Sequence, residues 1–188
     1  MKVGDRVGTL ARWRSPAPPW VEWLIVRPPD ELPHFKPHLP DFVVKVFDGS
    51  RCGSSNDLFR EFAREFSFPS YFGENWDALD DFLTDDYFVP TDGCLILFEK
   101  AKLLLSSSER EFLIFQSAMR NCGEAWATPD LRSQVLDDDG SPVDPQRIIP
   151  FHVVLVSSEH TDPPSRNWIH PVFEWNPEEI RPESSGAV

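Results

Sequence analysis

Cysteine is scarce in this sequence, and long apolar runs are missing. The 188 residues include only Cys52, Cys94 and Cys122, which cannot all pair and do not have the spacing of a metal site. The longest apolar stretches, residues 20–26 and 151–156, are far shorter than the ~20 residues that span a bilayer. The N-terminus also lacks the basic flank, apolar run and cleavage site of a secretory signal. We therefore expect a cytoplasmic protein with no membrane segment.

Basic residues are also few. The chain has 18 Lys and Arg against 31 Asp and Glu, which gives a formal net charge of −13. This charge disfavours binding to nucleic acid or to anionic membranes, and it favours cationic partners. The sequence contains neither an HExxH zinc motif nor a GxSxG nucleophile motif, and its five histidines are scattered. We predict that the protein is not an enzyme and needs no cofactor.

One acidic sequence raises the question of a metal ion. Asp137-Asp138-Asp139 precedes Gly140, in a segment rich in turn-forming residues. A calcium loop of the EF-hand type alternates its ligands and ends in a distant Glu, and this segment does neither. We therefore predict a solvated turn and no metal site.

The sequence does contain a row of carboxylates along one predicted helix, directly after Tyr71-Phe72-Gly73-Glu74-Asn75. Successive helical residues rotate by about 100°, so the helix has two distinct sides. The apolar side comprises Trp76, Leu79, Phe82 and Leu83, and the opposite side comprises Asp77, Asp81, Thr84 and Asp85. Asn75 is placed to cap the helix. Asp77 and Asp81 repel each other at a spacing of four residues, so another interaction must offset that cost.

No basic residue interrupts the acidic residues of this region, which are Glu74, Asp77, Asp80, Asp81, Asp85, Asp86 and Asp92. Two interpretations fit such a pattern. The first is an ordinary solvated helix face, and the second is a docking surface for a cationic partner. The pattern of charges alone favours the first interpretation, whereas the order and spacing of the residues in the motif favour the second.

The stretch from Tyr71 to Thr84 resembles the signature of the barstar family of intracellular ribonuclease inhibitors. It reads as an aromatic pair, Gly-Glu-Asn, an apolar residue, Asp-Ala-Leu, any residue, Asp, two more residues and Thr. The resemblance covers residues 41–122 and 150–157. It implies that Asp77 and Asp81 enter the active site of a nuclease and that Tyr71 and Thr84 touch its rim.

Two positions depart from the family's best-known member, since Asp80 replaces a Trp and Ser117 replaces a Glu. These departures leave the identity of the partner open. We predict that partner contacts involve six residues, which are Tyr71, Asp77, Asp80, Asp81, Thr84 and Asp85.

The predicted fold is of the α/β class, with a small three-stranded parallel sheet flanked by helices, as in the barstar family. The predicted strands are residues 42–47, 94–98 and 151–156, and the predicted helices are residues 57–66, 76–84, 101–105 and 108–123. Ser55 or Asn56 is expected to cap the first of these helices, and Ser108 with Glu111 forms a capping box for the last. Helices between buried strands imply parallel pairing. The strand-like residues 20–26 are expected to add a strand at an edge.

We divide the chain into three parts. Residues 1–40 form a Pro- and Trp-rich N-terminal extension, residues 41–157 form the barstar-like domain with an insertion at 124–149, and residues 158–188 form a C-terminal extension. The C-terminal extension carries Trp168, Phe173 and Trp175, which we expect to pack back onto the domain.

The leading interpretation is an inhibitor that covers the active site of a cationic ribonuclease with its acidic helix and so protects the producing cell. The expected partner is an extracellular-type ribonuclease or a related secreted toxin with a basic cleft. A second interpretation keeps the fold but assigns an immunity protein or adaptor that binds a non-ribonuclease toxin or another basic protein. A third, in which Asp77 and Asp81 act as paired catalytic carboxylates, has little support because no other catalytic motif accompanies them.

Overall fold

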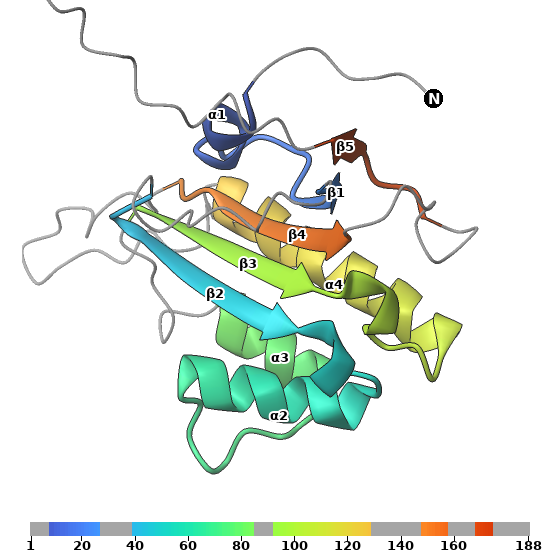
Figure 1. Ribbon diagram of the computed structural model, residues 1–188. Coiled ribbons are helices and arrows are strands. Elements are labelled where there is room, and N and C mark those ends of the chain that lie inside the picture. Colours follow the sequence, from blue (N-terminus) through green and yellow to red (C-terminus); the bar gives the residue numbers. More distant parts are fainter. Residues whose placement is uncertain (1–7, 27–38, 85–91, 129–147, 158–167, 175–188) are drawn as a thin grey trace, which may run out of the picture.

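A computed structural model describes residues 8–26, 39–84, 92–128, 148–157 and 168–174. Its centre is a five-stranded sheet with the strand order β2-β3-β4-β1-β5, and every neighbouring pair is parallel (Figure 1). The strands are β1 (Val21–Ile25), β2 (Phe42–Asp48), β3 (Gly93–Glu99), β4 (Phe151–Ser157) and β5 (Val172–Glu174). The predicted class, a parallel sheet flanked by helices, is confirmed. The predicted number of three strands is wrong.

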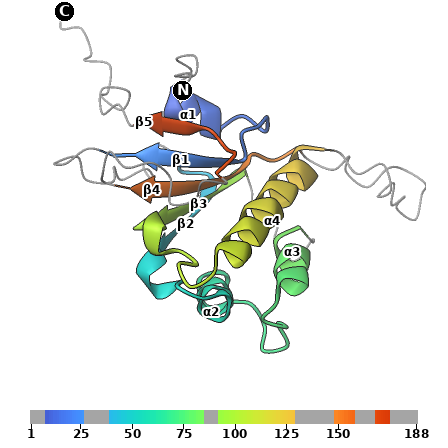
Figure 2. The same cartoon turned by 90° about the vertical axis from the view of Figure 1, so that its right-hand side faces the viewer.

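The helices cover the two faces of the sheet unequally. They are α1 (Thr9–Trp13), α2 (Ser55–Phe66), α3 (Trp76–Thr84) and α4 (Glu109–Ala127), with short 3-10 turns η2 (Gly49–Arg51) and η3 (Ala101–Leu103). On one face of the sheet lie α2, α3 and α4 (Figure 2). They bury the larger core against strand residues such as Trp23 and Ile96. On the other face, α1 covers a smaller core that contains Trp13 and Leu24.

Strand β1 lies inside the sheet, between β4 and β5, and not at its edge as predicted. Its residue Val21 pairs with Val153 of β4, and Trp23 pairs with Val172 of β5. All of its residues are buried, and the indole of Trp23 donates a hydrogen bond of 3.0 Å to Ser157. A strand that is covered on both faces and paired on both sides belongs in a sheet interior. The sequence pattern did not reveal β5, whose three residues are too few to produce a periodic signal.

The aromatic residues of the C-terminal extension pack on the sheet as expected. The ring of Trp168 meets that of Trp23 edge-on at 5.4 Å, and Phe173 packs on the smaller core. Trp175 lies outside the described residues. Both chain extensions therefore contribute strands and apolar surface to the sheet.

A buried ion pair attaches α1 to β1. Glu22 is fully buried, and its two carboxylate oxygens accept hydrogen bonds of 2.9 and 3.1 Å from Arg12. The indole of Trp13 donates a further hydrogen bond of 2.8 Å to the same carboxylate. The guanidinium of Arg12 lies over the ring of Phe173, 3.7 Å from its centroid. The charged pair thus joins α1 to β1 within the N-terminal extension, and the contact of Arg12 with Phe173 joins both to the C-terminal extension.

Helix α4 continues past Gly123, where the sequence predicted its end. The glycine at this position is explained by a close contact, because a Cβ atom at Gly123 would lie 2.3 Å from the side chain of Trp20. The glycine therefore makes room for a tryptophan and does not terminate the helix. Four of the 26 residues assigned to the insertion, 124–127, belong to α4, and most of the others lie outside the described residues, including the acidic triplet.

The helix starts follow local capping rules. Ser54 caps α2 by accepting from the backbone N–H of Asp57. The predicted caps, Ser55 and Asn56, are one and two residues further on and lie inside the helix. Ser108 caps α4 as predicted, by accepting from the N–H of Glu111 at 3.3 Å.

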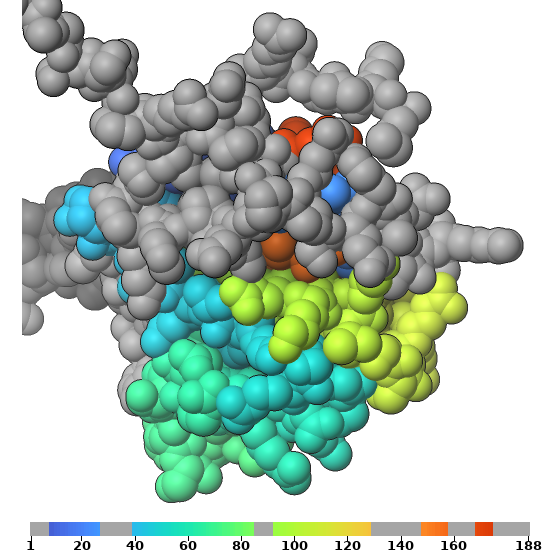
Figure 3. All heavy atoms as spheres, viewed as in Figure 1, coloured from blue at the N-terminus to red at the C-terminus, as the bar shows by residue number. Residues whose placement is uncertain are grey.

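In the space-filling view, atoms of α2, β2 and the segment after β3 form one continuous surface (Figure 3). Among the described residues, no helix has the length and apolar character needed to cross a membrane.

Buried His152 makes the stability of this fold depend on pH. Its ring nitrogens lie 3.0 Å from the carbonyl oxygen of Pro19 and 2.7 Å from that of Ser15. Burial lowers the pKa of His152 below its ordinary value of 6.5, and the positive charge of Arg12 acts in the same direction. The two carbonyls and the nearby Glu22 raise this pKa, but they do not outweigh burial. The folded protein therefore holds this ring neutral at a pH where the unfolded chain already binds a proton.

We expect the free energy of unfolding to fall as the pH is lowered through 6.5, because the unfolded state then takes up the extra proton. Urea denaturation at several pH values between 5 and 8 measures this slope. The variant His152→Gln, which has no group that titrates there, controls for other sites such as His170, whose pKa burial also lowers. A wild-type slope equal to that of the variant contradicts the prediction.

Candidate protein-binding helix

The loop between α2 and α3 places the acidic helix. Helix α2 ends at Phe66, and the next residue, Ser67, adopts a left-handed conformation with φ of 56°. Glu74 adopts another, with φ of 45°. Asn75 then caps α3 as predicted, because its side-chain oxygen accepts a hydrogen bond of 2.9 Å from the N–H of Ala78. Its amide group also donates to the carbonyl of Gly73 at 3.0 Å. These bonds set the direction in which α3 leaves the loop.

Helix α3 is attached to α4 at both ends. At its start, the indole of Trp76 donates a hydrogen bond of 2.8 Å to the carboxylate of Glu111. At its end, the carbonyl of Leu83 accepts a hydrogen bond of 2.8 Å from the indole of Trp126. Leu79 and Leu83 are fully buried between these two contacts. A helix held in this way presents its outer side in a fixed orientation.

Asp77 and Asp81 lie on that outer side and are exposed to solvent. No ion pair involving either residue is found in the described part of the chain. Asp77 lies in the first turn, where the helix dipole favours negative charge, whereas Asp81 is one turn further on. The repulsion between the two carboxylates is thus only partly offset within the helix.

Asp80 and Thr84 make contacts inside the protein. Asp80 is half-buried, and its carboxylate accepts a hydrogen bond of 3.5 Å from the thiol of Cys122 on α4. The hydroxyl of Thr84 donates to the backbone carbonyl of Asp80 at 2.7 Å. Burial and the neighbouring Asp80 carboxylate raise the pKa of Cys122 well above its ordinary value, so this thiol stays protonated and able to donate. Asp80 is therefore turned toward α4 more than Asp77 or Asp81.

Two aromatic residues before the helix differ in exposure. Tyr71 is 75% exposed and rests against Phe82 at a ring distance of 6.0 Å, whereas Phe72 is buried. Of the six predicted contact residues, Tyr71, Asp77 and Asp81 are exposed, Asp80 and Thr84 are half-buried, and Asp85 lies outside the described residues.

One basic residue reaches the acidic region from elsewhere in the chain. The guanidinium of Arg60, on α2, lies 3.7 Å from the carboxylate of Glu74, so this part of the acidic field is compensated. The sequence analysis missed this pair because it considered only residues within the acidic stretch. Both side chains are largely exposed, and such a pair contributes little to stability. The described residues contain no group of three or more His, Cys, Asp or Glu side chains arranged to hold a metal ion.

The fold and this site define a class, that of parallel α/β proteins which present an acidic helix held by a neighbouring helix. The family model described as "Barstar (barnase inhibitor)" matches residues 42–142, more than half of the chain. The chain belongs to the barstar family, a family of ribonuclease inhibitors. The match spans β2, α2, α3, β3 and α4, whereas β1, β4 and β5 lie outside it. No curated protein matches the chain.

Proposed function

We propose that this protein inhibits a cationic ribonuclease by inserting the outer side of α3 into its active site, and that it thereby protects the cell that makes it. The observation that carries the proposal is the exposure of Asp77 and Asp81 on a helix whose two ends are hydrogen-bonded to α4. In this proposal residues 41–157 form the inhibitory unit, which acts in the cytoplasm, and the two extensions widen its sheet.

The mechanism requires recognition and no chemical step. A ribonuclease must line its cleft with Arg, Lys or His side chains in order to hold RNA phosphates. The carboxylates of Asp77 and Asp81 take the places of two such phosphates, because a planar guanidinium pairs with a carboxylate through two charge-assisted hydrogen bonds. The inhibitor thus binds groups that the enzyme cannot lose without losing its activity.

The rigid attachment of α3 favours tight binding. A contact surface that is already ordered loses little conformational entropy when it binds, and the hydrogen bonds of Trp76 and Trp126 provide that order. The net charge of −13 attracts a cationic partner over a distance and so raises the association rate at low salt. In this proposal Tyr71 makes a contact at the rim of the interface, which its exposed ring and polar hydroxyl allow.

The proposal can be tested by affinity capture. Immobilised protein is incubated with the lysate and the secreted fraction of the source organism, and the retained material is assayed for ribonuclease activity and identified by mass spectrometry. We expect a basic ribonuclease that is held by the wild type and lost from the Asp77→Ala, Asp81→Ala double variant. A second double variant, Glu109→Ala with Glu124→Ala, removes the same charge from exposed positions of α4 and serves as the control.

Two other outcomes contradict parts of the proposal. A basic toxin without ribonuclease activity, lost from the double variant, identifies the acidic helix as the binding site but replaces the ribonuclease with another target. The exposed Ser117, at a position where the family's best-known member has a Glu, is the feature that favours this alternative. A partner that both variants retain equally shows that α3 is not the binding site.

A further inference from the structure

An exposed aromatic ring borders the acidic side of α3. Tyr71 is 75% exposed, and its ring rests on that of Phe82, with 6.0 Å between the ring centroids and 41° between the ring planes. Phe82 directly follows Asp81 in the helix. Because successive helical residues rotate by about 100°, Asp80 and Phe82 lie on opposite flanks of Asp81. Asp80 is the one that contacts α4, so the aromatic surface lies on the flank away from α4.

The ring of Phe82 is held in place by other aromatic side chains. Its centroid lies 4.8 Å from that of Phe68 and 5.5 Å from that of Phe72, which is buried. Phe68 in turn stacks on Phe66 at the end of α2, at a ring distance of 5.8 Å. Phe82 is thus part of a packed cluster that joins α3 to the loop before it. This cluster gives the ring of Tyr71 a firm support.

The protein combines a carboxylate and an aromatic ring at another place, where both contact an arginine. The guanidinium of Arg12 pairs with the two carboxylate oxygens of Glu22, and it lies over the ring of Phe173, 3.7 Å from the centroid. A guanidinium is planar, so it binds a carboxylate along its edge and an aromatic ring on its face. The ammonium of a lysine is a compact, strongly hydrated charge without such a face. A carboxylate beside an aromatic ring therefore favours arginine over lysine.

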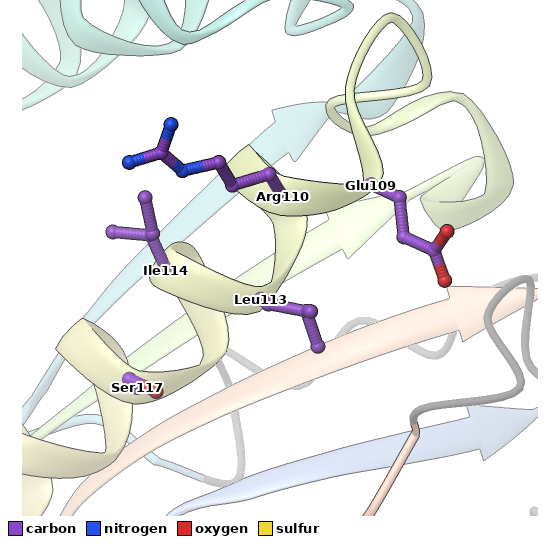
Figure 4. Close-up of a pocket in the computed structure, with 5 residues that line it drawn as sticks. All are labelled: Glu109, Arg110, Leu113, Ile114 and Ser117. Carbon is purple, nitrogen blue, oxygen red and sulfur yellow. The ribbon is translucent and has the colours of Figure 1, made fainter.

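A second open surface on the same layer of helices lacks this combination. It is a shallow hollow along the outer surface of α4, lined by Glu109, Arg110, Leu113, Ile114 and Ser117 (Figure 4). None of these described lining residues is aromatic, and the positive charge of Arg110 disfavours a second cation. Of these two surfaces, the side of α3 next to Tyr71 is the one that fits a guanidinium.

We propose that Tyr71 and Asp81 together select an arginine side chain of the cationic partner, and that Phe82 is the residue that positions Tyr71. The edge of the guanidinium pairs with the carboxylate of Asp81, and its face stacks on the open face of the Tyr71 ring. This inference rests on the proposed function, because it concerns the same side of α3. It adds the chemical identity of the partner's group, a guanidinium that an ammonium does not replace.

The test compares two peptides of equal charge, hexa-arginine and hexa-lysine with blocked ends, in NMR titrations of the full-length protein. The ring signals of Tyr71 and the backbone signals of residues 71–84 report binding at this site separately from other acidic surfaces. We expect hexa-arginine to bind at least about threefold more tightly than hexa-lysine, the ratio that one stacking contact at an exposed site provides. Neither peptide is a ribonuclease, so this test and the capture of a ribonuclease succeed or fail independently.

Variants of Tyr71 separate the face of the ring from simple apolar contact. Tyr71→Leu keeps an apolar side chain without a ring, so we expect it to weaken hexa-arginine by about threefold and to remove most of the preference over hexa-lysine. Tyr71→Phe keeps the ring and is expected to keep the preference. Asp81→Ala is expected to weaken both peptides. Leu113→Ala shortens an exposed side chain in the hollow on α4, and it is the control expected to change neither.

The positioning role of Phe82 has its own measurement. Phe82→Leu keeps an apolar side chain in the cluster but removes the ring on which Tyr71 rests. We expect the preference for hexa-arginine to fall as it does in Tyr71→Leu. A lower melting temperature with an unchanged preference would make Phe82 a purely structural residue and contradict this role.

Three results overturn the proposed selection of arginine. The first is equal binding of the two peptides by the wild type, which reduces the site to charge alone. The second is an equal weakening of both peptides in Tyr71→Leu, which makes the ring a contact without selectivity. The third is a full preference for hexa-arginine in Tyr71→Leu, which assigns that preference to the carboxylates.

Discussion

Replacing Asp81 with Ala is expected to weaken binding to the cationic partner by ~2 kcal/mol or more, about thirtyfold, while leaving the stability of the fold nearly unchanged. Asp81 lies on the exposed side of α3, one turn beyond the first turn that the helix dipole favours, so folding gains little from its charge. In a complex the same carboxylate becomes desolvated beside cationic groups, and its removal leaves one of them without a partner.

The measurement is the dissociation constant of the partner captured in the affinity experiment, for wild type and variant, with urea denaturation of both. Glu124→Ala provides the matched control, because it removes one carboxylate from an exposed helical position on α4. We expect that control to lower the association rate slightly and to leave the dissociation rate unchanged. Equal losses for Asp81→Ala and Glu124→Ala would show that only net charge matters.

The second large effect is expected on stability, from Glu22→Ala. The substitution removes the carboxylate that pairs with Arg12 and accepts a hydrogen bond from the indole N–H of Trp13, in a site where the side chain of Arg12 is only 13% exposed. Breaking a buried ion pair by removing one partner costs about 3–5 kcal/mol. We expect a loss of that size in the free energy of unfolding, measured by urea denaturation.

The control for this prediction is an exposed ion pair. Arg60 lies 3.7 Å from Glu74, and their side chains are 66% and 49% exposed, so Arg60→Ala is expected to cost less than about 1 kcal/mol. A similarly small cost for Glu22→Ala would mean that the N-terminal extension folds onto the sheet without contributing to its stability. The expected large cost would instead show that the extension is part of the cooperative unit.

The acidic helix was predictable because its determinants are local. Asn75 caps it three residues before Ala78, and the helical period alone separates Leu79 from Asp77 and Asp81. The same period contains a signal about Asp80 that the sequence analysis did not use. Asp80 lies on the helix surface next to Trp76 and Leu83, which places it nearer to α4 than to solvent.

The errors concern contacts between residues that are distant in the sequence. Gly123 has the appearance of a helix terminator, but Trp20, which is 103 residues earlier, occupies the space of its missing side chain. The interior position of β1 depends on its pairing with β5. Strand β5 begins at Val172, which is 147 residues after Ile25, the last residue of β1. Strand order is set by such pairings, for which a single sequence carries no local marker.

By itself, the sequence determined that this protein is a parallel α/β protein of the barstar family with an exposed row of carboxylates on a capped helix. Capping, helical periodicity and the order of residues in a motif act over a few positions and are legible in the chain. Only the tertiary structure decided that the sheet has five strands, that Asp80 is turned toward Cys122, and that Trp20 occupies the space beside Gly123. These features depend on which distant segments pack together, and packing is decided by the burial of surfaces that are complementary only once the chain has folded.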